Sequence, residues 1–139
     1  MEVKYGPRLH AAYAQPGGAG LEAWIDAMPN ERYQSLFGLA PAQVRERFLD
    51  GAPEDVLAFC VALDDDELAS LVTDLGGHDV TAMLDAFAEC DAVPDRPSVV
   101  FAYTVKGWGL PLAGNPRNHS ALVTGEQIDA LRTRVGLTP

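Results

Sequence analysis

The sequence predicts an α/β fold that is mostly helical, with one strong central parallel strand at about residues 98–105 and a short strand near the N-terminus. Apolar residues recur at helical spacing between residues 21 and 90. Residues 98–105 are then a nearly continuous run of strand formers without polar alternation, which is typical of a central parallel strand covered on both faces. A chain of 139 residues fits one domain.

The first twenty residues are predicted to hold a short strand, Val3–Tyr5, which ends at Gly6–Pro7. A turn-rich stretch follows from Gln15 to Gly20, where proline and glycine break any periodicity. Residues 1–20 are therefore expected to form a strand and a turn-rich segment that pair with or lead into another part of the structure.

Residues 21–90 are predicted to form a series of short helices. Pro41 and Pro53 stand where first helical residues belong. Asp64 and Glu67 have capping-box spacing, and Gly76 is placed to end the helix that they open. The side chains expected to face inward in these helices are Leu21, Trp24, Ile25, Met28, Val44, Phe48, Val56, Leu57, Cys60, Leu68, Leu71, Val72 and Leu75.

One more helix is expected before the strand. Asp79 can cap its start, and a linker from Asp91 to Pro97 follows it. Its inward face is predicted to consist of Val80, Met83, Leu84 and Phe87.

The strand at residues 98–105 needs neighbours on both edges, because the polar backbone groups of a buried strand must be paired. The chain offers at best one other short strand, so the missing strands are expected on another chain or a missing segment. A loop rich in Gly, Pro and Asn then spans residues 106–124. Thr124 and Gln127 form a second capping-box pattern, which predicts a last helix at residues 125–135 with Ile128, Leu131 and Val135.

The composition narrows the classes of partner. A net charge of −10 repels phosphate backbones and anionic lipids, so nucleic-acid and membrane partners are disfavoured. Cys60 and Cys90 lack metal-ligand spacing and fit a reducing compartment. The sequence has no signal-like start and no apolar run long enough to cross a membrane. A cytoplasmic protein is therefore expected.

The candidate site follows the strand, since ligands of parallel sheets bind beyond the carboxyl ends of the strands. Lys106 offers a point charge suited to a phosphate, and Gly107 and Gly109 permit close backbone approach. His119 can exchange protons near neutral pH. The alternative is that Lys106 is a solvated charge at a strand end and His119 an ordinary loop residue.

Three other residues are expected to be structural. Trp108 is interpreted as a core residue or loop anchor, and His78 as a histidine that satisfies backbone groups beside a capping aspartate. His10 is assigned to the surface or the core. The three histidines lack metal-ligand spacing, so the sequence predicts no metal site in this chain.

A longer string resembles a known family. Residues 96–109, preceded by Gly76–Asp79 and followed by Asn118–His119, resemble the homodimeric first, decarboxylating component of the pyruvate dehydrogenase complex, a transketolase-like enzyme that uses thiamine diphosphate. The similarity extends to Val3–Gly6, the Trp24–Ile25 helix, Pro29–Glu31 and Val44–Glu46.

The resemblance implies roles for the loop residues. Lys106, with Gly107 and Gly109 shaping the turn, would lie near the cofactor diphosphate. His119 would sit on a mobile loop and assist acyl transfer, and Asn118 would orient that loop. Such an enzyme decarboxylates a 2-oxoacid on the thiamine ring and passes the acyl group to a lipoyl arm.

The resemblance also implies that parts are missing. The Gly-Asp-Gly segment that holds magnesium in the family is absent, so the magnesium ligands are expected on a missing segment or partner chain. Residues 1–139 match only the C-terminal part of a diphosphate-binding domain. We therefore expect a split subunit or fragment, inactive alone, that assembles with other chains of the same enzyme. A lipoyl-bearing acyltransferase is a further candidate partner.

Two alternatives stay open. One is a non-catalytic fragment or acidic helical interaction domain, and the other is a transketolase-like component acting on sugar phosphates. In the preferred reading, the loop from Leu110 to His119 is expected to be poorly ordered without partner or cofactor.

Overall fold

The computed structural model describes residues 1–137 and is mostly helical, with one small parallel sheet. This confirms the predicted fold class. The strands are β1 (Glu2–Val3) and β2 (Phe101–Ala102). The helices are α1 (Pro7–Tyr13), α2 (Gly18–Ala27), α3 (Asn30–Gln34), α4 (Pro41–Leu49), α5 (Glu54–Cys60), α6 (Asp65–Val72), the 3-10 helix η1 (Gly76–His78), α7 (Val80–Asp91) and α8 (Gly125–Arg134).

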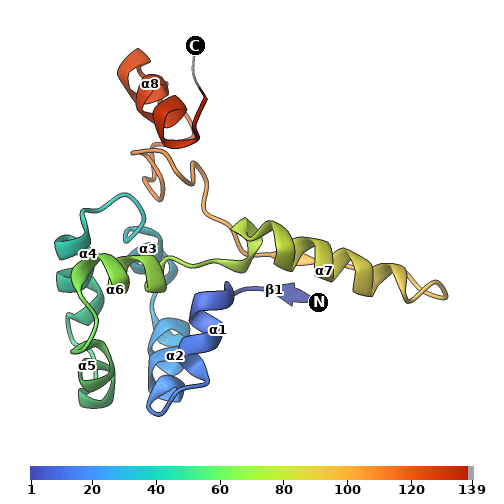
Figure 1. Ribbon diagram of the computed structural model, residues 1–139, viewed down its shortest axis with the longest axis horizontal. Helices are drawn as coiled ribbons and strands as arrows, with labels where there is room; N and C mark the ends of the chain where they lie inside the picture. The colour runs from blue at the N-terminus through green and yellow to red at the C-terminus, as the bar shows by residue number, and fades with distance from the viewer. Residues whose placement is uncertain (138–139) are drawn as a thin grey trace.

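Helices α1 to α6 form a helical lobe, residues 7–72, which gathers at one end of the molecule (Figure 1). α4 packs on α6 and α2 packs on α5. Most residues predicted to face inward there are buried, and Pro41 begins α4 as expected. The fully buried side chains of the lobe are Phe48, Leu9, Leu21, Leu36, Leu68, Val44, Val56, Val72 and Cys60.

Polar side chains bind the helices of the lobe to one another. Arg45 on α4 pairs with the Asp65 carboxylate and donates to the Leu63 carbonyl at the start of α6. The Trp24 Nε1–H donates to the Phe48 carbonyl at 3.0 Å, and the Tyr33 hydroxyl donates to a carbonyl of α6 at 2.7 Å. Burial of apolar side chains is non-directional and does not by itself fix how the helices are oriented. These directional bonds fix that orientation.

Several local predictions for the lobe are wrong. Residues 1–20 contain helix α1 as well as a strand and a turn, and α3 was not predicted. Leu57 is exposed, and Pro53 precedes α5 as its N-cap. The helix capped by Asp64 ends at Val72, well before Gly76, because the chain turns there to reach the bridge between Tyr5 and Leu75.

The sheet consists of β1 and β2 running parallel, with Glu2 opposite Phe101 and Val3 opposite Ala102. The Phe101 N–H donates to the Met1 carbonyl at 2.9 Å, and the Tyr103 N–H donates to the Val3 carbonyl at 3.0 Å. The regular strand is thus much shorter than the predicted residues 98–105. Phe101 is 60% exposed, so this chain by itself does not cover the strand on both faces.

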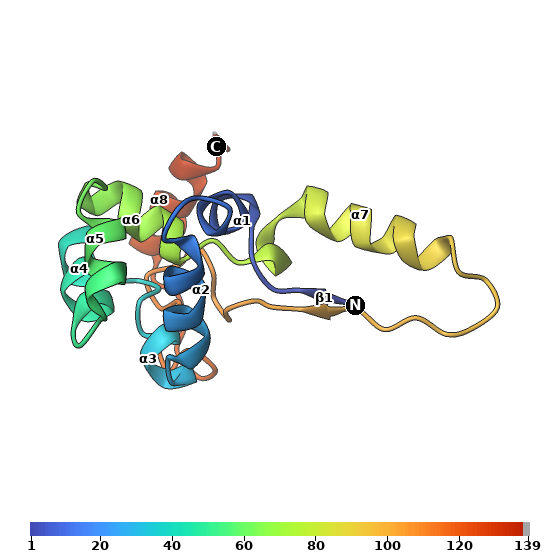
Figure 2. The same ribbon diagram turned by 90° about the horizontal axis from the view of Figure 1, so that it is seen from below.

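Helix α7 leaves the lobe and runs alongside the two strands (Figure 2). Asp79 caps it as predicted, accepting from the Ala82 N–H at 2.7 Å. The predicted inward face is wrong, however, because Val80, Leu84 and Phe87 are exposed and only Ala86 is buried. Within residues 1–137, most of that face is therefore open to solvent.

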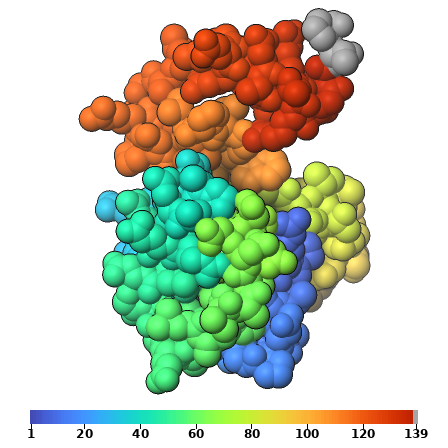
Figure 3. All heavy atoms as spheres, turned by 60° about the vertical axis from the view of Figure 1, so that its left-hand side comes forward, coloured from blue at the N-terminus to red at the C-terminus, as the bar shows by residue number. Residues whose placement is uncertain are grey.

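The C-terminal helix α8 sits over the rest of the molecule, linked to it by the loop (Figure 3). Thr124 and Gln127 form the predicted capping box, with the Gln127 N–H donating to Thr124 Oγ1 at 3.3 Å. Ile128 and Val135 are exposed. Among residues 1–137, no helix is both long and apolar enough to cross a membrane.

Candidate functional site

The Lys106–Gly109 turn lies beyond the carboxyl end of β2, after residues 103–105, in the region where the sequence predicted the site. The Trp108 N–H donates to the Val105 carbonyl at 3.2 Å, and the Leu110 N–H donates to the Gly107 carbonyl at 2.9 Å. Gly107 and Gly109 have φ of +74° and +79°. Side chains with a Cβ rarely adopt this left-handed backbone, so the two glycines make the double turn possible.

His78 holds the strand end that leads into this turn. Its Nε2 accepts the Val105 N–H at 2.9 Å, and its ring stacks on Trp108 with centroids 4.8 Å apart and an interplanar angle of 14°. Burial lowers the pKa of His78. The predicted structural role is confirmed, since His78 satisfies a backbone donor beside the capping residue Asp79.

Asn118 closes the loop on itself. Its Nδ2 donates to the Lys106 carbonyl at 2.8 Å and to the Leu112 carbonyl at 3.3 Å. His119 is therefore adjacent to a residue bound to the Lys106 backbone. The His119 ring is exposed, with Nδ1 3.1 Å from the Pro116 carbonyl oxygen. A carbonyl only accepts, so in this hydrogen bond Nδ1 is protonated, which leaves Nε2 of a neutral ring able to take a proton.

The charge distribution of the chain favours an anion at this loop. The side chains of residues 106–139 include four Lys and Arg against two Asp and Glu, a net charge of +2, whereas those of residues 1–105 include six against eighteen, a net charge of −12. Lys106 is exposed and forms no ion pair within residues 1–137. Its ammonium group is available to a phosphate from outside.

The other side of the loop rests on the helical lobe. Val105 and Ala113 are buried against Phe37 and Leu75. Gly114 lies so close to the Gln34 carbonyl that a Cβ there would collide with it. This packing positions the loop between the lobe and α8.

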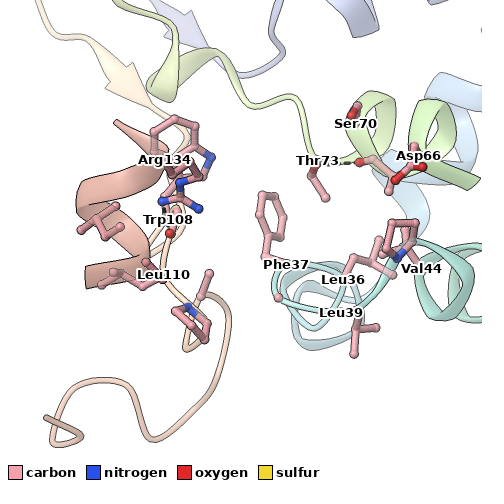
Figure 4. Close-up of a pocket in the computed structure, with 18 of the residues that line it drawn as sticks. Leu36, Phe37, Leu39, Val44, Asp66, Ser70, Thr73, Trp108, Leu110 and Arg134 are labelled. Carbon is pink, nitrogen blue, oxygen red and sulfur yellow. Dashed lines mark hydrogen bonds between the residues drawn. The ribbon is translucent and has the colours of Figure 1, made fainter. Parts of the chain in front are cut away.

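A cavity of about 520 Å³ separates the loop and α8 from the lobe. In Figure 4, Trp108, Leu110 and Arg134 face it from one side and Phe37 and Leu36 from the other. Arg134 donates to the Gly109 carbonyl and so ties α8 to the turn. Sequence reasoning missed Arg134, and only its place in the last turn of a helix marked it as suited to carbonyl groups.

The residues present fit one part of a thiamine diphosphate site. Lys106 supplies a cation, and Gly107 and Gly109 let the backbone come close to a phosphate. Within the described part of the chain, no group of three or more His, Cys, Asp or Glu side chains could hold a metal ion. Magnesium would need ligands from elsewhere.

Comparison with known proteins identifies the family of the chain. The family described as "Transketolase, thiamine diphosphate binding domain" matches residues 68–139, more than half of the chain and all of the loop. The chain therefore belongs to the transketolase-like thiamine diphosphate-binding family. No solved structure gave a significant match.

The curated relatives fall into two groups. The pyruvate dehydrogenase E1 component of Pseudomonas aeruginosa is 29% identical over 131 residues, 94% of this chain and 14% of that protein. The component of the same name from Buchnera aphidicola is 33% identical over 86 residues, 62% of this chain and 9% of that protein. The chromosomal transketolase of Cupriavidus necator is 37% identical over 67 residues, 48% of this chain and 10% of that protein.

The chain thus spans between 9% and 14% of the length of these relatives. Neither the family match nor the relatives assign a role to a particular residue. The roles of Lys106, Gly107, Gly109 and His119 remain predictions, as does the mobility of the loop.

Proposed function

We propose that this chain supplies part of the thiamine diphosphate site of a 2-oxoacid dehydrogenase of the pyruvate type. The complete enzyme would decarboxylate a 2-oxoacid and pass the acyl group to a lipoyl carrier, in the cytoplasm. The observation that supports this most is the Lys106–Gly109 turn, which places a cation and two left-handed glycines a few residues beyond the carboxyl end of β2.

Each residue of the turn and loop has a distinct task in this proposal. The Lys106 ammonium binds the diphosphate, while Gly107 and Gly109 leave space for it. Asn118 holds the loop to the Lys106 carbonyl, and His119 Nε2 moves a proton during acyl transfer. Thiamine diphosphate, when bound, would supply a nucleophilic ring carbon and a cationic ring that delocalises the electron pair left by decarboxylation.

The share of the chain covered by the relatives favours a pyruvate dehydrogenase over a transketolase. The transketolase of Cupriavidus necator has the higher identity but covers 48% of the chain, whereas the Pseudomonas component covers 94%. An alignment over 94% of the chain must include most of the helical lobe together with the loop, whereas one over 67 residues is too short to include all of both. The lobe is therefore an argument for the dehydrogenase class.

The open sheet supports the proposal that further segments complete the site. In a parallel ladder, alternate residues direct their backbone groups to opposite edges. Phe101 and Tyr103 donate toward β1, so Val100, Ala102 and Thr104 direct theirs to the other edge. We propose that strands from other chains or segments pair there and that the same segments supply the magnesium ligands.

The test is calorimetry of thiamine diphosphate with Mg²⁺, on the chain alone and in its natural assembly. Lys106→Met should weaken cofactor binding at least about tenfold, the effect of losing roughly 1.4 kcal/mol of charge-assisted binding. Arg117→Met, an equivalent loss of charge in the same loop, is the control and should change the affinity by less than about twofold.

His119→Ala gives the second readout. It should leave cofactor affinity unchanged while slowing acyl transfer to a lipoyl acceptor by about 10²-fold or more, whereas His10→Ala should change neither. An assembly that binds thiamine diphosphate equally well with Lys106→Met would contradict the proposed site. A stable lone monomer, indifferent to cofactor and to co-expressed chains, would instead support an interaction domain.

A further inference from the structure

His78 and the preceding Gly77 contact three parts of the chain around the site. Its Nε2 accepts the Val105 N–H at 2.9 Å, at the end of the extended segment. Its ring face lies on Trp108, inside the Lys106–Gly109 turn, with centroids 4.8 Å apart. The preceding Gly77 donates its N–H to the Tyr103 carbonyl at 3.1 Å. Together, Gly77 and His78 therefore contact the chain on both sides of Lys106.

The hydrogen bond from Val105 requires a neutral imidazole. A backbone N–H only donates, so Nε2 must present a lone pair and the ring proton must be on Nδ1. Protonation would place hydrogens on both nitrogens and set two donors, N–H and N–H, against each other. The same event would replace a neutral ring by a cation next to Lys106.

The charged and titratable groups around His78 come from every element that packs near it. Asp79 accepts the Ala82 N–H at 2.7 Å as the cap of α7, and the Asp74 carboxylate accepts the Arg8 N–H at 2.8 Å. Neither carboxylate forms a hydrogen bond or ion pair with the His78 ring. Arg8 on α1, Asp74 before η1 and Asp79 at the start of α7 line one hollow with His78 and Trp108, and Arg134 lines another with Trp108. Tyr103, whose carbonyl accepts the Gly77 N–H, and Lys106, which follows Val105, are the titratable residues of the facing segment.

We propose that His78 is a positioning residue that holds the Lys106–Gly109 turn only while its imidazole is neutral, so that acidification releases Trp108 and weakens diphosphate binding. The part of this inference that concerns diphosphate binding rests on the function proposed above. The release of Trp108 does not, since it concerns contacts within this chain alone.

The direction of the pH effect follows from the environment of the ring. Burial lowers the pKa of His78 below its ordinary value of 6.5. The hydrogen bond from Val105 and the stacking on Trp108 are therefore fully formed at and above neutral pH. Both contacts are lost as the pH falls through the folded-state pKa of His78, which lies below 6.5, and the free energy of unfolding decreases over the same range.

Tryptophan fluorescence of the 139-residue chain tests the release directly. Release would end the stacking of the Trp108 indole on the His78 ring and expose it further to water, which shifts its emission maximum to longer wavelength. An imidazolium that stayed stacked would instead quench the emission without this shift and would contradict release. Between about pH 8 and pH 5, the emission should show one transition with a midpoint below the ordinary histidine pKa. Trp108→Phe, which leaves Trp24 as the other indole, should abolish it, and His119→Gln should preserve it.

His78→Gln separates titration from structure, because its amide oxygen can still accept the Val105 N–H but cannot be protonated. The variant should show no emission transition. Helical circular dichroism recorded at each pH verifies that wild type and variant are folded. If the variant fails to fold, the wild-type titration and its Trp108→Phe control still decide the outcome.

The part that concerns diphosphate binding is tested with inorganic pyrophosphate and Mg²⁺ on the natural assembly. From pH 7.5 to pH 5.5, the dissociation constant of the wild type should rise on the order of tenfold relative to that of His78→Gln, the effect of one lost hydrogen bond. Taking the ratio of the two proteins at each pH removes the titration of the ligand itself.

The outcomes distinguish this inference from the proposed function. Emission that stays constant with pH, or a transition that persists in His78→Gln, overturns the role of His78 and leaves the function untouched. An intact emission transition with no pyrophosphate binding at any pH overturns the proposed function alone. A pH-independent ratio of dissociation constants overturns the link between His78 and the diphosphate.

Discussion

The helical lobe and the C-terminal half, residues 76–137, differ in how far their large apolar side chains are buried. In the lobe, Phe48, Leu9 and Leu21 are fully buried. In the C-terminal half, Phe87 is 50% exposed, and Phe101 and Trp108 are more exposed still. Both halves have helical or strand periodicity, so periodicity alone does not tell which apolar face has a partner.

The physical difference lies in the number of layers that each half provides. An apolar face is stable when a second layer covers it. Six helices cover one another in the lobe, whereas the C-terminal half has η1, α7, one short strand, a loop and α8. The lobe has the contacts of an independent core, and the C-terminal half has those of a surface that another layer would complete.

The largest expected effect comes from removing equivalent phenylalanine rings in the two regions. Phe48→Ala should lower the free energy of unfolding by about 3–5 kcal/mol, since it leaves a cavity in a closed core. Phe87→Ala should change it by less than about 0.5 kcal/mol in the isolated chain. Urea unfolding followed by circular dichroism measures both, and similar losses in the two variants would refute the contrast.

A smaller effect is expected from the polar bonds that fasten the lobe. Arg45→Ala should cost about 2 kcal/mol, because the Leu63 carbonyl and the Asp65 carboxylate lose a charged donor. The control is Arg132→Ala, which removes an exposed partner of Asp129 and should cost under about 0.5 kcal/mol. Equal shifts in the urea midpoint would show that Arg45 is no more than a surface charge.

The smallest effect concerns one helix start. Asp64→Ala should cost about 1 kcal/mol, because the Asp64 side chain accepts the Glu67 N–H at 2.8 Å. Asp66→Ala removes a carboxylate from the same turn without removing a cap and should cost about 0.3 kcal/mol. Thermal unfolding of both variants orders them, and the reverse order would contradict the capping assignment.

Much of the fold could be predicted because some signals act over a few residues. The capping boxes at Asp64 and Thr124 and the proline at the start of α4 have the predicted geometry. The helix α1 was missed although Pro7 stands at its first turn. This helix is too short, and too close to the preceding strand, to give a clear periodic pattern in the sequence. Its packing on α2 and α6 stabilises it.

The loop residues were found in the sequence, but their connections were not. The positive φ of Gly107 and Gly109 follows from a turn that glycine alone tolerates well. The bonds from Asn118 to Lys106, from Arg134 to Gly109 and from Val105 to His78 join residues far apart along the chain. No local pattern encodes such pairs.

The sequence by itself determined where helices start, where the glycine turn lies and which thiamine diphosphate family the chain belongs to, because each depends on residue type and short spacing. The tertiary structure alone decided which apolar faces are buried and what holds the turn. Burial depends on which elements meet, so the face of α7 that looks like a core in the sequence is open in the fold, and His78 becomes a link only where η1 and the end of β2 meet.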